Sequence, residues 1–288
     1  MCPYVIFTDT GCDIAPDVLA QWNVRYIDLR FHAENSDKAY IGADIPSKEF
    51  YQTMRDGAVY KTSAANIDDF MQAFKPTLEA GQDVLYLGFS SGLSGTANAA
   101  RMAAQELAAS FPERKIIVID TLCASAGEGM VVCFAVKKRD EGASLDENAA
   151  YVNEIYPQMC HWFTVDDLVY LKRGGRVSAA TALVGTMLNI KPVLHVDDEG
   201  HLIKVDVARG RKQSIAALAK KYTELALDPN GGEYFISHGD CYGDAKKLAD
   251  LIEAAHGVSC SCITDIGPVI GSHAGPGTIA LFFLGKAR

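Results

Sequence analysis

The clearest structural signal in this chain is residues 84–100, VLYLGFSSGLSGTANAA. The apolar first part predicts a buried strand, and the Ala-rich last part predicts a helix. The loop between them, Ser90 to Thr96, is rich in hydroxyls and opens the helix. The first N–H groups of a helix have no intrahelical partner, so such a loop is suited to bind a carboxylate or phosphate. A simpler interpretation is that Ser94 only caps the helix and the glycines only turn the chain.

The same strand, polar loop and helix order occurs elsewhere in the first half. A strand over Tyr4 to Phe7 is followed by Thr8 to Asp13, with Asp13 as the expected N-cap of the next helix. A strand over Lys115 to Ile119 is likewise followed by a polar loop and a helix. Alternating strands and helices predict a parallel sheet with helices on both faces. Ligands bind beyond the carboxyl ends of such strands, so we expect these loops to share one edge.

The second half mixes helices with a hairpin. Two apolar strands, Ile190 to Val196 and Leu202 to Val207, flank an Asp-Asp-Glu-Gly turn. Before them, a basic turn leads to a helix over 179–188 that Ser178 is expected to cap, and a Gly-rich run over 266–277 leads into a last apolar strand. We therefore predict a two-domain α/β protein. A Rossmann-like parallel sheet domain spans 1–157, and a mixed α/β domain with hairpins spans 158–288.

Composition excludes several classes of function. The chain has 288 residues and a net charge of −9, which argues against a nucleic-acid-binding protein. It shows no charged leader and no apolar run near the roughly 20 residues of a membrane span, so we expect a cytoplasmic protein without stable membrane insertion. Its eight cysteines form no CxxC pair and have no histidines at zinc spacing, so we expect reduced thiols and no metal site.

Motifs for cofactors and catalysis are weak. The chain has no GxGxxG after its first strand and no GxxxxGK[ST], so no nucleotide cofactor is expected. Ser94 could be a nucleophile and His273 its base, but Leu93-Ser94-Gly95 is not a GxSxG elbow. A histidine in a Gly-rich run is as often a structural hydrogen-bonding group as a catalyst. A serine hydrolase acting on a carboxylate or phosphate ester therefore remains an alternative.

Six motifs, in order and over essentially the whole length, resemble the DegV family of bacterial fatty-acid-binding proteins, the carrier subunits of a two-component fatty acid kinase. The matching segments are Thr8-Asp9-Thr10 with Asp13, Thr62-Ser63 before a helix, Ser90-Ser91-Gly92-Leu93-Ser94-Gly95-Thr96, Leu171-Lys172-Arg173-Gly174-Gly175-Arg176-Val177-Ser178, Leu188-Asn189-Ile190-Lys191-Pro192 and Gly271-Ser272-His273-Ala274-Gly275-Pro276-Gly277. Ala64-Ala65-Asn66 departs from the Gln-Pro-Ser that often follows the TS pair, although Asn66 can still cap a helix.

The resemblance implies a long-chain fatty acid between the two domains. Its carboxylate would be held by Thr62, Ser63, Ser94 and Gly95, with His273 nearby. Each buried methylene contributes roughly 0.8 kcal/mol, so the tail would dominate the affinity and neutral groups would suffice for the head.

The resemblance also implies a protein partner. A separate ATP-dependent kinase would phosphorylate the bound carboxylate, and the acyl phosphate would enter phospholipid synthesis. The chain itself would be a carrier without catalytic activity or cofactor. Two basic clusters in an acidic chain lead us to the hypothesis of a surface patch for the kinase or its phosphates, although each could be a solvated helix end. Its members would be Arg173, Arg176, Arg209 and Arg211.

Overall fold

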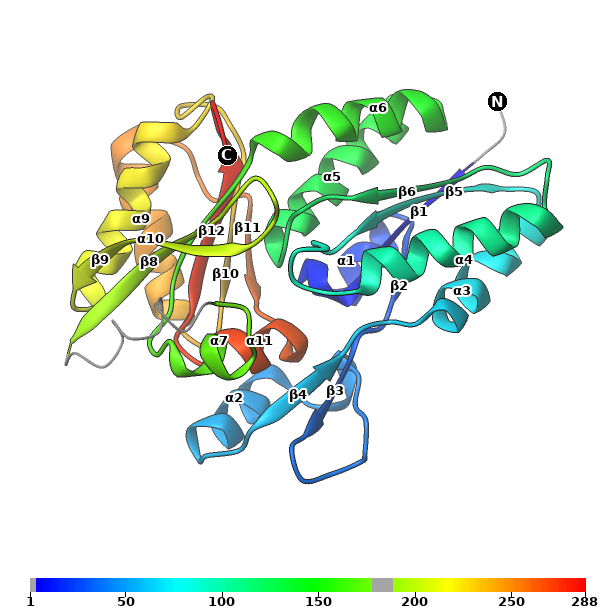
Figure 1. Cartoon of the computed structure of the whole chain (residues 1–288). Helices are drawn as coiled ribbons and strands as arrows, with labels where there is room; N and C mark the ends of the chain where they lie inside the picture. Colours follow the sequence, from blue (N-terminus) through cyan, green and yellow to red (C-terminus); the bar gives the residue numbers. More distant parts are fainter. Residues whose placement is uncertain (1–3, 178–188) are drawn as a thin grey trace.

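Two sheets lie side by side in the computed structural model of this protein, which describes residues 4–177 and 189–288 (Figure 1). A four-stranded sheet belongs to the first half of the chain and a six-stranded sheet to the second, as the two-domain prediction requires. A short two-stranded sheet is additional. The predicted cap at Ser178 and the helix predicted over 179–188 lie outside the described residues. The precise boundary near Pro157 stays a prediction.

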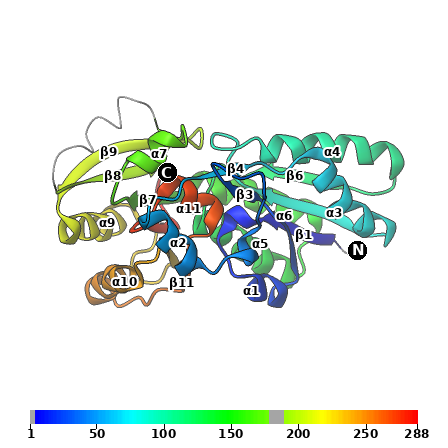
Figure 2. The ribbon, with the colours of Figure 1, turned by 90° about the horizontal axis from the view of Figure 1, so that it is seen from below.

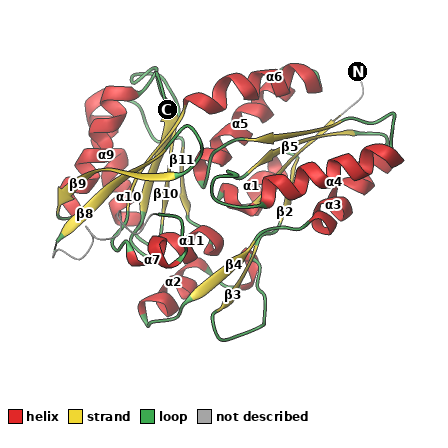
Figure 3. Cartoon of the chain, in the orientation of Figure 1, coloured by secondary structure: helices red, strands yellow, loops and turns green. Residues whose placement is uncertain are grey.

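The first sheet is entirely parallel, as predicted, in the order β2-β1-β5-β6. Its strands are β1 (Tyr4–Asp9), β2 (Val24–Ile27), β5 (Asp83–Gly88) and β6 (Ile116–Asp120). Apolar residues of α3 (Ile67–Glu79) and α4 (Thr96–Ser110) pack on one face. Those of α1 (Pro16–Gln21), α5 (Ala126–Asp140) and α6 (Leu145–Ile155) pack on the other. Helices therefore cover both faces (Figure 3).

The second sheet is mixed, in the order β11-β10-β12-β7-β8-β9. Only β10 and β11 run parallel; the other neighbours are antiparallel, and β8 and β9 form the predicted hairpin. One face of this sheet packs on α9 (Arg211–Leu225) and α10 (Tyr242–His256), and the other face packs on α5. The core around α5 contains apolar residues of both sheets, so it joins the two halves of the chain. The elements are η3 (Tyr156–Gln158), β7 (Met159–Thr164), α7 (Val169–Arg173), β8 (Ile190–Val196), β9 (Leu202–Arg209), α9 (Arg211–Leu225), β10 (Tyr234–His238), α10 (Tyr242–His256), β11 (Cys262–Asp265), α11 (Pro268–Ala274) and β12 (Ile279–Leu284).

A segment of the first half crosses to the second. The strands β3 (Arg30–Ala33) and β4 (Tyr60–Ser63) pair antiparallel. The short helix η2 (Gly42–Asp44) and the helix α2 (Ser47–Arg55) lie between them in the sequence, whereas η1 (Thr10–Cys12) follows β1. Phe31, Phe50, Tyr51 and Met54 form an aromatic-rich cluster beneath them. This unit contacts α11, and both views place it there (Figures 1 and 2). It thereby brings Thr62 and Ser63 toward the second domain.

Asp13 does not cap α1, contrary to the prediction. The N-cap is Ala15, without a side-chain cap. Asp13 instead has a left-handed backbone with φ of 51°. Its carboxyl accepts hydrogen bonds from Gly267 N (2.8 Å) and Ser125 Oγ (2.5 Å), so it joins the first loop to α5 and to the second domain.

Candidate functional site

A mostly apolar cavity lies between the two halves of the molecule. Its empty space is about 970 Å³, part of it open to solvent, which is the size of a typical small-molecule site. The first half contributes apolar side chains such as Leu29, Phe89 and Leu93, and the second half contributes others such as Phe163 and Leu202. A long apolar ligand in this cavity would therefore be buried by both domains.

A polar cluster interrupts the apolar lining. It contains Thr62 and Ser63 from β4, Ser94 and Gly95 from the loop before α4, and His273 from α11. All five are residues that the sequence analysis assigned to the carboxylate, and they line one cavity although they come from three distant segments. Thr62 Oγ1 and His273 Nε2 are 2.7 Å apart and share a hydrogen bond. That bond joins the crossing segment to the second domain.

His273 is an uncharged member of this cluster. Burial and the nearby positive charge of Arg176 lower its pKa from 6.5 to about 4, so the ring is neutral near pH 7. Gly174 explains how the ring fits, because a Cβ at this position would lie only 2.1 Å from His273 Nδ1. The first glycine of the Gly174-Gly175 pair therefore makes room for the histidine.

In the loop before α4, Ser94 orders the backbone but does not cap the helix. Ser94 Oγ accepts a hydrogen bond from Thr96 N (3.3 Å) and lies 2.9 Å from Thr96 Oγ1, so it does order the loop. The N-cap of α4 is Gly95, and no side chain caps the helix there. The positive end of α4 therefore faces the cavity at Gly95, where an anion would be stabilised.

Arg176 lines the cavity, whereas the sequence analysis placed it in a surface patch. Its Nε and Nη2 donate to Leu93 O (3.2 and 3.1 Å), and its Nη1 donates to Gly174 O (2.5 Å). The guanidinium thus connects the basic turn to the loop that carries Ser94, and burial lowers its pKa. Sequence spacing could not show this, because Leu93 and Arg176 are 83 residues apart in the chain.

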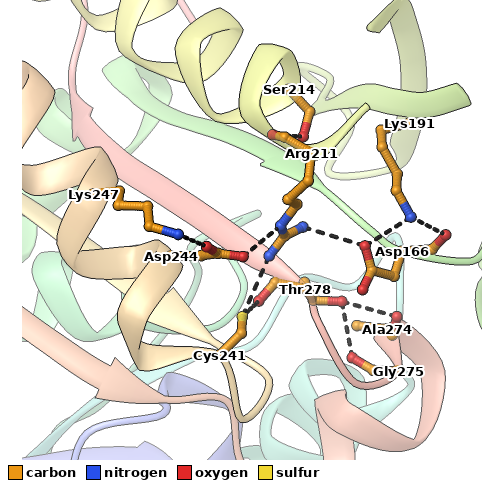
Figure 4. Close-up of polar contacts among 10 residues, drawn as sticks. All are labelled: Asp166, Lys191, Arg211, Ser214, Cys241, Asp244, Lys247, Ala274, Gly275 and Thr278. Carbon is orange, nitrogen blue, oxygen red and sulfur yellow. Dashed lines mark hydrogen bonds and ion pairs between the residues drawn. The ribbon is translucent and has the colours of Figure 1, made fainter. Parts of the chain in front are cut away.

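The other three arginines of the expected patch lie in different environments. Arg173 and Arg209 are exposed. Arg211 instead belongs to an ion-pair network (Figure 4), in which its Nε donates to Asp244 Oδ2 (2.9 Å) and its Nη1 lies 3.6 Å from Asp166 Oδ1. Lys191 also pairs with Asp166, at 2.8 Å. Arg211 therefore ties α9 to α10 and to the start of the segment that carries α7.

Ser94 and His273, the nucleophile and base of the alternative hydrolase, do not form a catalytic pair in the described residues 4–177 and 189–288. Ser94 Oγ bonds to Thr96, and His273 Nε2 bonds to Thr62, so no hydrogen bond joins the expected nucleophile to its base. No carboxylate in that part of the chain bonds to His273 either. A triad requires both of these contacts.

Comparison with known proteins gives the same family along the whole chain. The family model described as "Uncharacterised protein, DegV family" matches residues 3–286. A DegV domain-containing protein of Clostridium perfringens is 39% identical over 289 residues, covering 100% of this chain and 99% of that protein. The chain belongs to the DegV family. Another DegV domain-containing protein, from Lactococcus lactis, is 36% identical over 284 residues and 98% of each chain.

Solved DegV structures share this fold. A DegV protein from Thermus thermophilus, described as binding fatty acid, has a TM-score of 0.88 and 31% identity, covering 99% of this chain and 100% of that one. A Thermotoga maritima protein, described as having a fatty acid binding function, has a TM-score of 0.85 and 28% identity, with the same coverage. These relatives confirm the α/β fold that the motifs implied.

Two further observations concern membranes and metals. No helix within the described ranges has both the length and the apolar character to cross a bilayer. Within those ranges, the turn between β8 and β9 brings Asp197, Glu199 and His201 together, with ligand atoms within 4.8 Å of one another. Glu199 and His201 are exposed, and nothing else among the described residues points to a cation there.

Proposed function

We propose that this protein binds a long-chain fatty acid in the cavity between its two domains. The carboxylate lies at the cluster of Thr62, Ser63, Ser94, Gly95 and His273, together with Arg176. The observation that carries the proposal is an apolar cavity with one anion-suited polar cluster, to which both domains contribute. The fatty acid binding described for the Thermus and Thermotoga relatives supports it.

The tail supplies most of the binding free energy. Each buried methylene contributes roughly 0.8 kcal/mol, so a long acyl chain contributes on the order of 10 kcal/mol before the costs of binding. The head group then needs only modest stabilisation. This division explains how a site with neutral hydroxyls can still bind the acid tightly.

The head-group site offers donors and one positive charge. A guanidinium has five N–H donors, and three of those of Arg176 bond to Leu93 O and Gly174 O. The remaining N–H groups of Arg176 make no bond to other described residues, so they and the helix end at Gly95 are available to oxygen atoms. The hydroxyls of Thr62 and Ser94, which bond to His273 and Thr96, line the same cavity. Such donors suit a carboxylate and an acyl phosphate alike.

The finer part of the proposal is a carrier role in the cytoplasm. The protein presents the bound carboxylate to a separate ATP-dependent fatty acid kinase, which forms the acyl phosphate used in phospholipid synthesis, and has no catalytic activity of its own. Arg173 and Arg209 contact the kinase, because they are the exposed members of the basic set. Arg176 and Arg211 act from inside, at the head group and in the ion-pair network.

The carrier and the hydrolase are separated by a pair of assays on Ser94→Ala and His273→Ala. We expect both variants to bind a fluorescent fatty acid with reduced affinity, and neither they nor the wild type to hydrolyse a nitrophenyl ester. Ester hydrolysis by the wild type that both substitutions abolish would favour the hydrolase.

The kinase contact is tested by charge reversal. Arg173→Glu with Arg209→Glu should lower acyl phosphate formation by an added kinase catalytic subunit and ATP, while fatty acid binding stays unchanged. The matched control is Lys220→Glu on α9, another exposed basic residue. Equal acyl phosphate formation in all three proteins would show that the two arginines do not contact the kinase.

A further inference from the structure

The floor of the cavity is one face of β7 and β12. Alternate residues of a strand face the same side, and Thr278, Ala280 and Phe282 line the cavity while Leu281 and Phe283 pack on the other side, in the core of α9 and α10. On β7, Phe163 and His161 line the cavity. The register pairs Ala280 with Phe163 and Phe282 with His161.

This floor has a direction. Thr278 Oγ1 donates to Ala274 O (2.9 Å), the residue directly after His273, so Thr278 lies near the head-group cluster. From Thr278, directly before β12, to Phe282 the chain advances four residues, or roughly 14 Å at about 3.4 Å per residue of extended strand. The next pair on the same face, Leu284 with Met159, does not line the cavity. The floor therefore ends at Phe282 and His161.

The far end is closed by tight packing. The rings of His161 and Phe282 meet edge to face, with centroids 5.3 Å apart. Above them, α5 approaches so closely that a Cβ on Gly127 would lie 2.3 Å from His161 Nε2 and 2.7 Å from Phe282 Cδ1. No space remains at this point between the helix and the sheet.

At the far end, the ring nitrogens of His161 are not available to a ligand. His161 Nε2 accepts a hydrogen bond from Ala124 N (3.2 Å), and His161 Nδ1 bonds to Met159 O (2.9 Å). Both ring nitrogens are thus engaged, and burial, with the nearby charge of Arg288, lowers the pKa of the ring well below its usual range. A neutral, hydrogen-bonded ring beside a phenyl ring suits the methyl end of an acyl chain.

We propose that His161, Phe282 and Gly127 form the end wall that sets the longest acyl chain this protein accepts. The inference rests on the proposed function and deepens it, because it assigns the chain-length limit to three residues. Chains that reach the wall bury all of their methylenes, and longer chains must bend or leave methylenes in water.

The test compares the affinities of saturated fatty acids of about 12 to about 22 carbons for wild type, Phe282→Ala and Phe282→Leu. Removing the ring lengthens the cavity, so the preferred chain should become longer, with roughly fourfold higher affinity for each methylene newly buried. Phe282→Leu should show the same shift in preferred chain length to a smaller extent. It keeps the test usable if the alanine variant does not fold. Phe283→Ala is the matched control, because Phe283 is equally buried on the opposite face of β12.

Gly127→Ala provides the opposite test. The added methyl group forces the ring of His161 toward the cavity, so the preferred chain should become shorter. Unchanged chain-length preference in the Phe282 and Gly127 variants would overturn the end wall while leaving fatty acid binding intact. Failure of the wild type to bind any acid of the series would instead overturn the proposed function.

Discussion

At the scale of single residues, the polar cluster that we propose as the carboxylate site combines one half-buried positive charge with neutral donors. Arg176 supplies the charge and also lowers the pKa of His273. Burial is the main cause of this lowered pKa and repulsion between like charges is the second, so the ring is neutral near pH 7. A carboxylate would reverse this balance by placing a negative charge beside the ring.

The pKa of His273 should therefore respond to the ligand. The pKa of the ring lies at about 4, and a bound carboxylate favours the protonated ring, so the pKa should rise when a fatty acid binds. NMR titration of the ring measures this, with His273→Gln to assign the signal. A pKa that stays the same with and without fatty acid would place the carboxylate elsewhere in the cavity.

Arg176 should matter for affinity, and its neighbour Arg173 should not. Arg176→Gln removes a hydrogen-bonded charge from the cavity lining, so we expect fatty acid affinity to fall roughly tenfold, the effect of about 1.5 kcal/mol for a bond to a charged group. Arg173→Gln is the control, because Arg173 is exposed three residues away. Titration calorimetry should separate the two variants, and equal affinities would remove Arg176 from the site.

Residue types and motifs identified the cluster only in part. Thr62, Ser63, Ser94 and His273 stood in recognisable segments, and Asn66 caps α3, as the sequence analysis expected it could. Arg176 was placed on the surface, because an arginine beside two glycines looks solvated until the fold of the turn is known. Its hydrogen bonds to Leu93 O depend on tertiary structure that no local pattern encodes.

At the scale of elements, the first loop and the start of α5 form a buried acidic joint. Asp13 bonds to Ser125 Oγ and Gly267 N, and Ser125 Oγ lies 2.8 Å from Ser237 Oγ of β10. Burial raises the pKa of Asp13 from 3.8 to about 8, and it raises that of Glu128 on α5 well above its usual range. These two carboxyl groups, Asp13 and Glu128, are therefore largely protonated near pH 7.

This joint should make stability depend on pH. The folded state holds the Asp13 proton up to about pH 8, whereas the unfolded chain loses it near 3.8, so the contribution is complete below 3.8 and is lost as the pH rises to about 8. In Asp13→Asn this loss should disappear. The free energy of unfolding of the variant, relative to that of wild type, should therefore increase between about pH 5 and about pH 8. Asp17→Asn, at an exposed carboxylate, is the control.

Urea unfolding at several pH values measures the difference between the two proteins. Glu128 titrates in both proteins, so the part of its effect that does not depend on the charge of Asp13 cancels in that difference. A gap between variant and wild type that is the same at every pH would contradict the buried protonated joint.

Elements with apolar runs and clear turn signals could be predicted from the sequence, whereas the helix α11 could not. Strands β1, β5 and β6 and the β8-β9 hairpin follow from apolar runs with clear turn signals. The sequence analysis assigned no helix to the run that contains α11, because its glycines and prolines are typical of loops. That helix forms since Pro268 suits a first turn and since α2, β3, β4 and α7 pack around it.

At the scale of the whole molecule, the cavity exists because the two domains are held together from several sides. Arg288 donates to Tyr156 O (3.0 Å) and Met159 O (3.2 Å), and it contacts Cys123 Sγ (3.2 Å) of the first domain. Ser90 Oγ donates to Gly200 O (2.9 Å) in the turn of the β8-β9 hairpin. These contacts fix the hairpin wall of the cavity against the loop that carries Ser94.

Arg288→Met should weaken this connection. The substitution leaves several carbonyl oxygens without their charged donor, so we expect unfolding to become easier by about 1 to 3 kcal/mol. Lys286→Met is the matched control, because Lys286 is exposed. Urea denaturation of both variants measures the effect, and equal stabilities would show that Arg288 does not hold the domains together.

The central claim is that the cavity between the domains carries a long-chain fatty acid. Mass spectrometry of the purified protein, first native and then after denaturation and solvent extraction, tests it most directly. We predict a mass increment in the native protein, and release of a stoichiometric fatty acid upon denaturation. A protein that carries no such molecule, and that stays empty after incubation with a series of fatty acids, would contradict the claim.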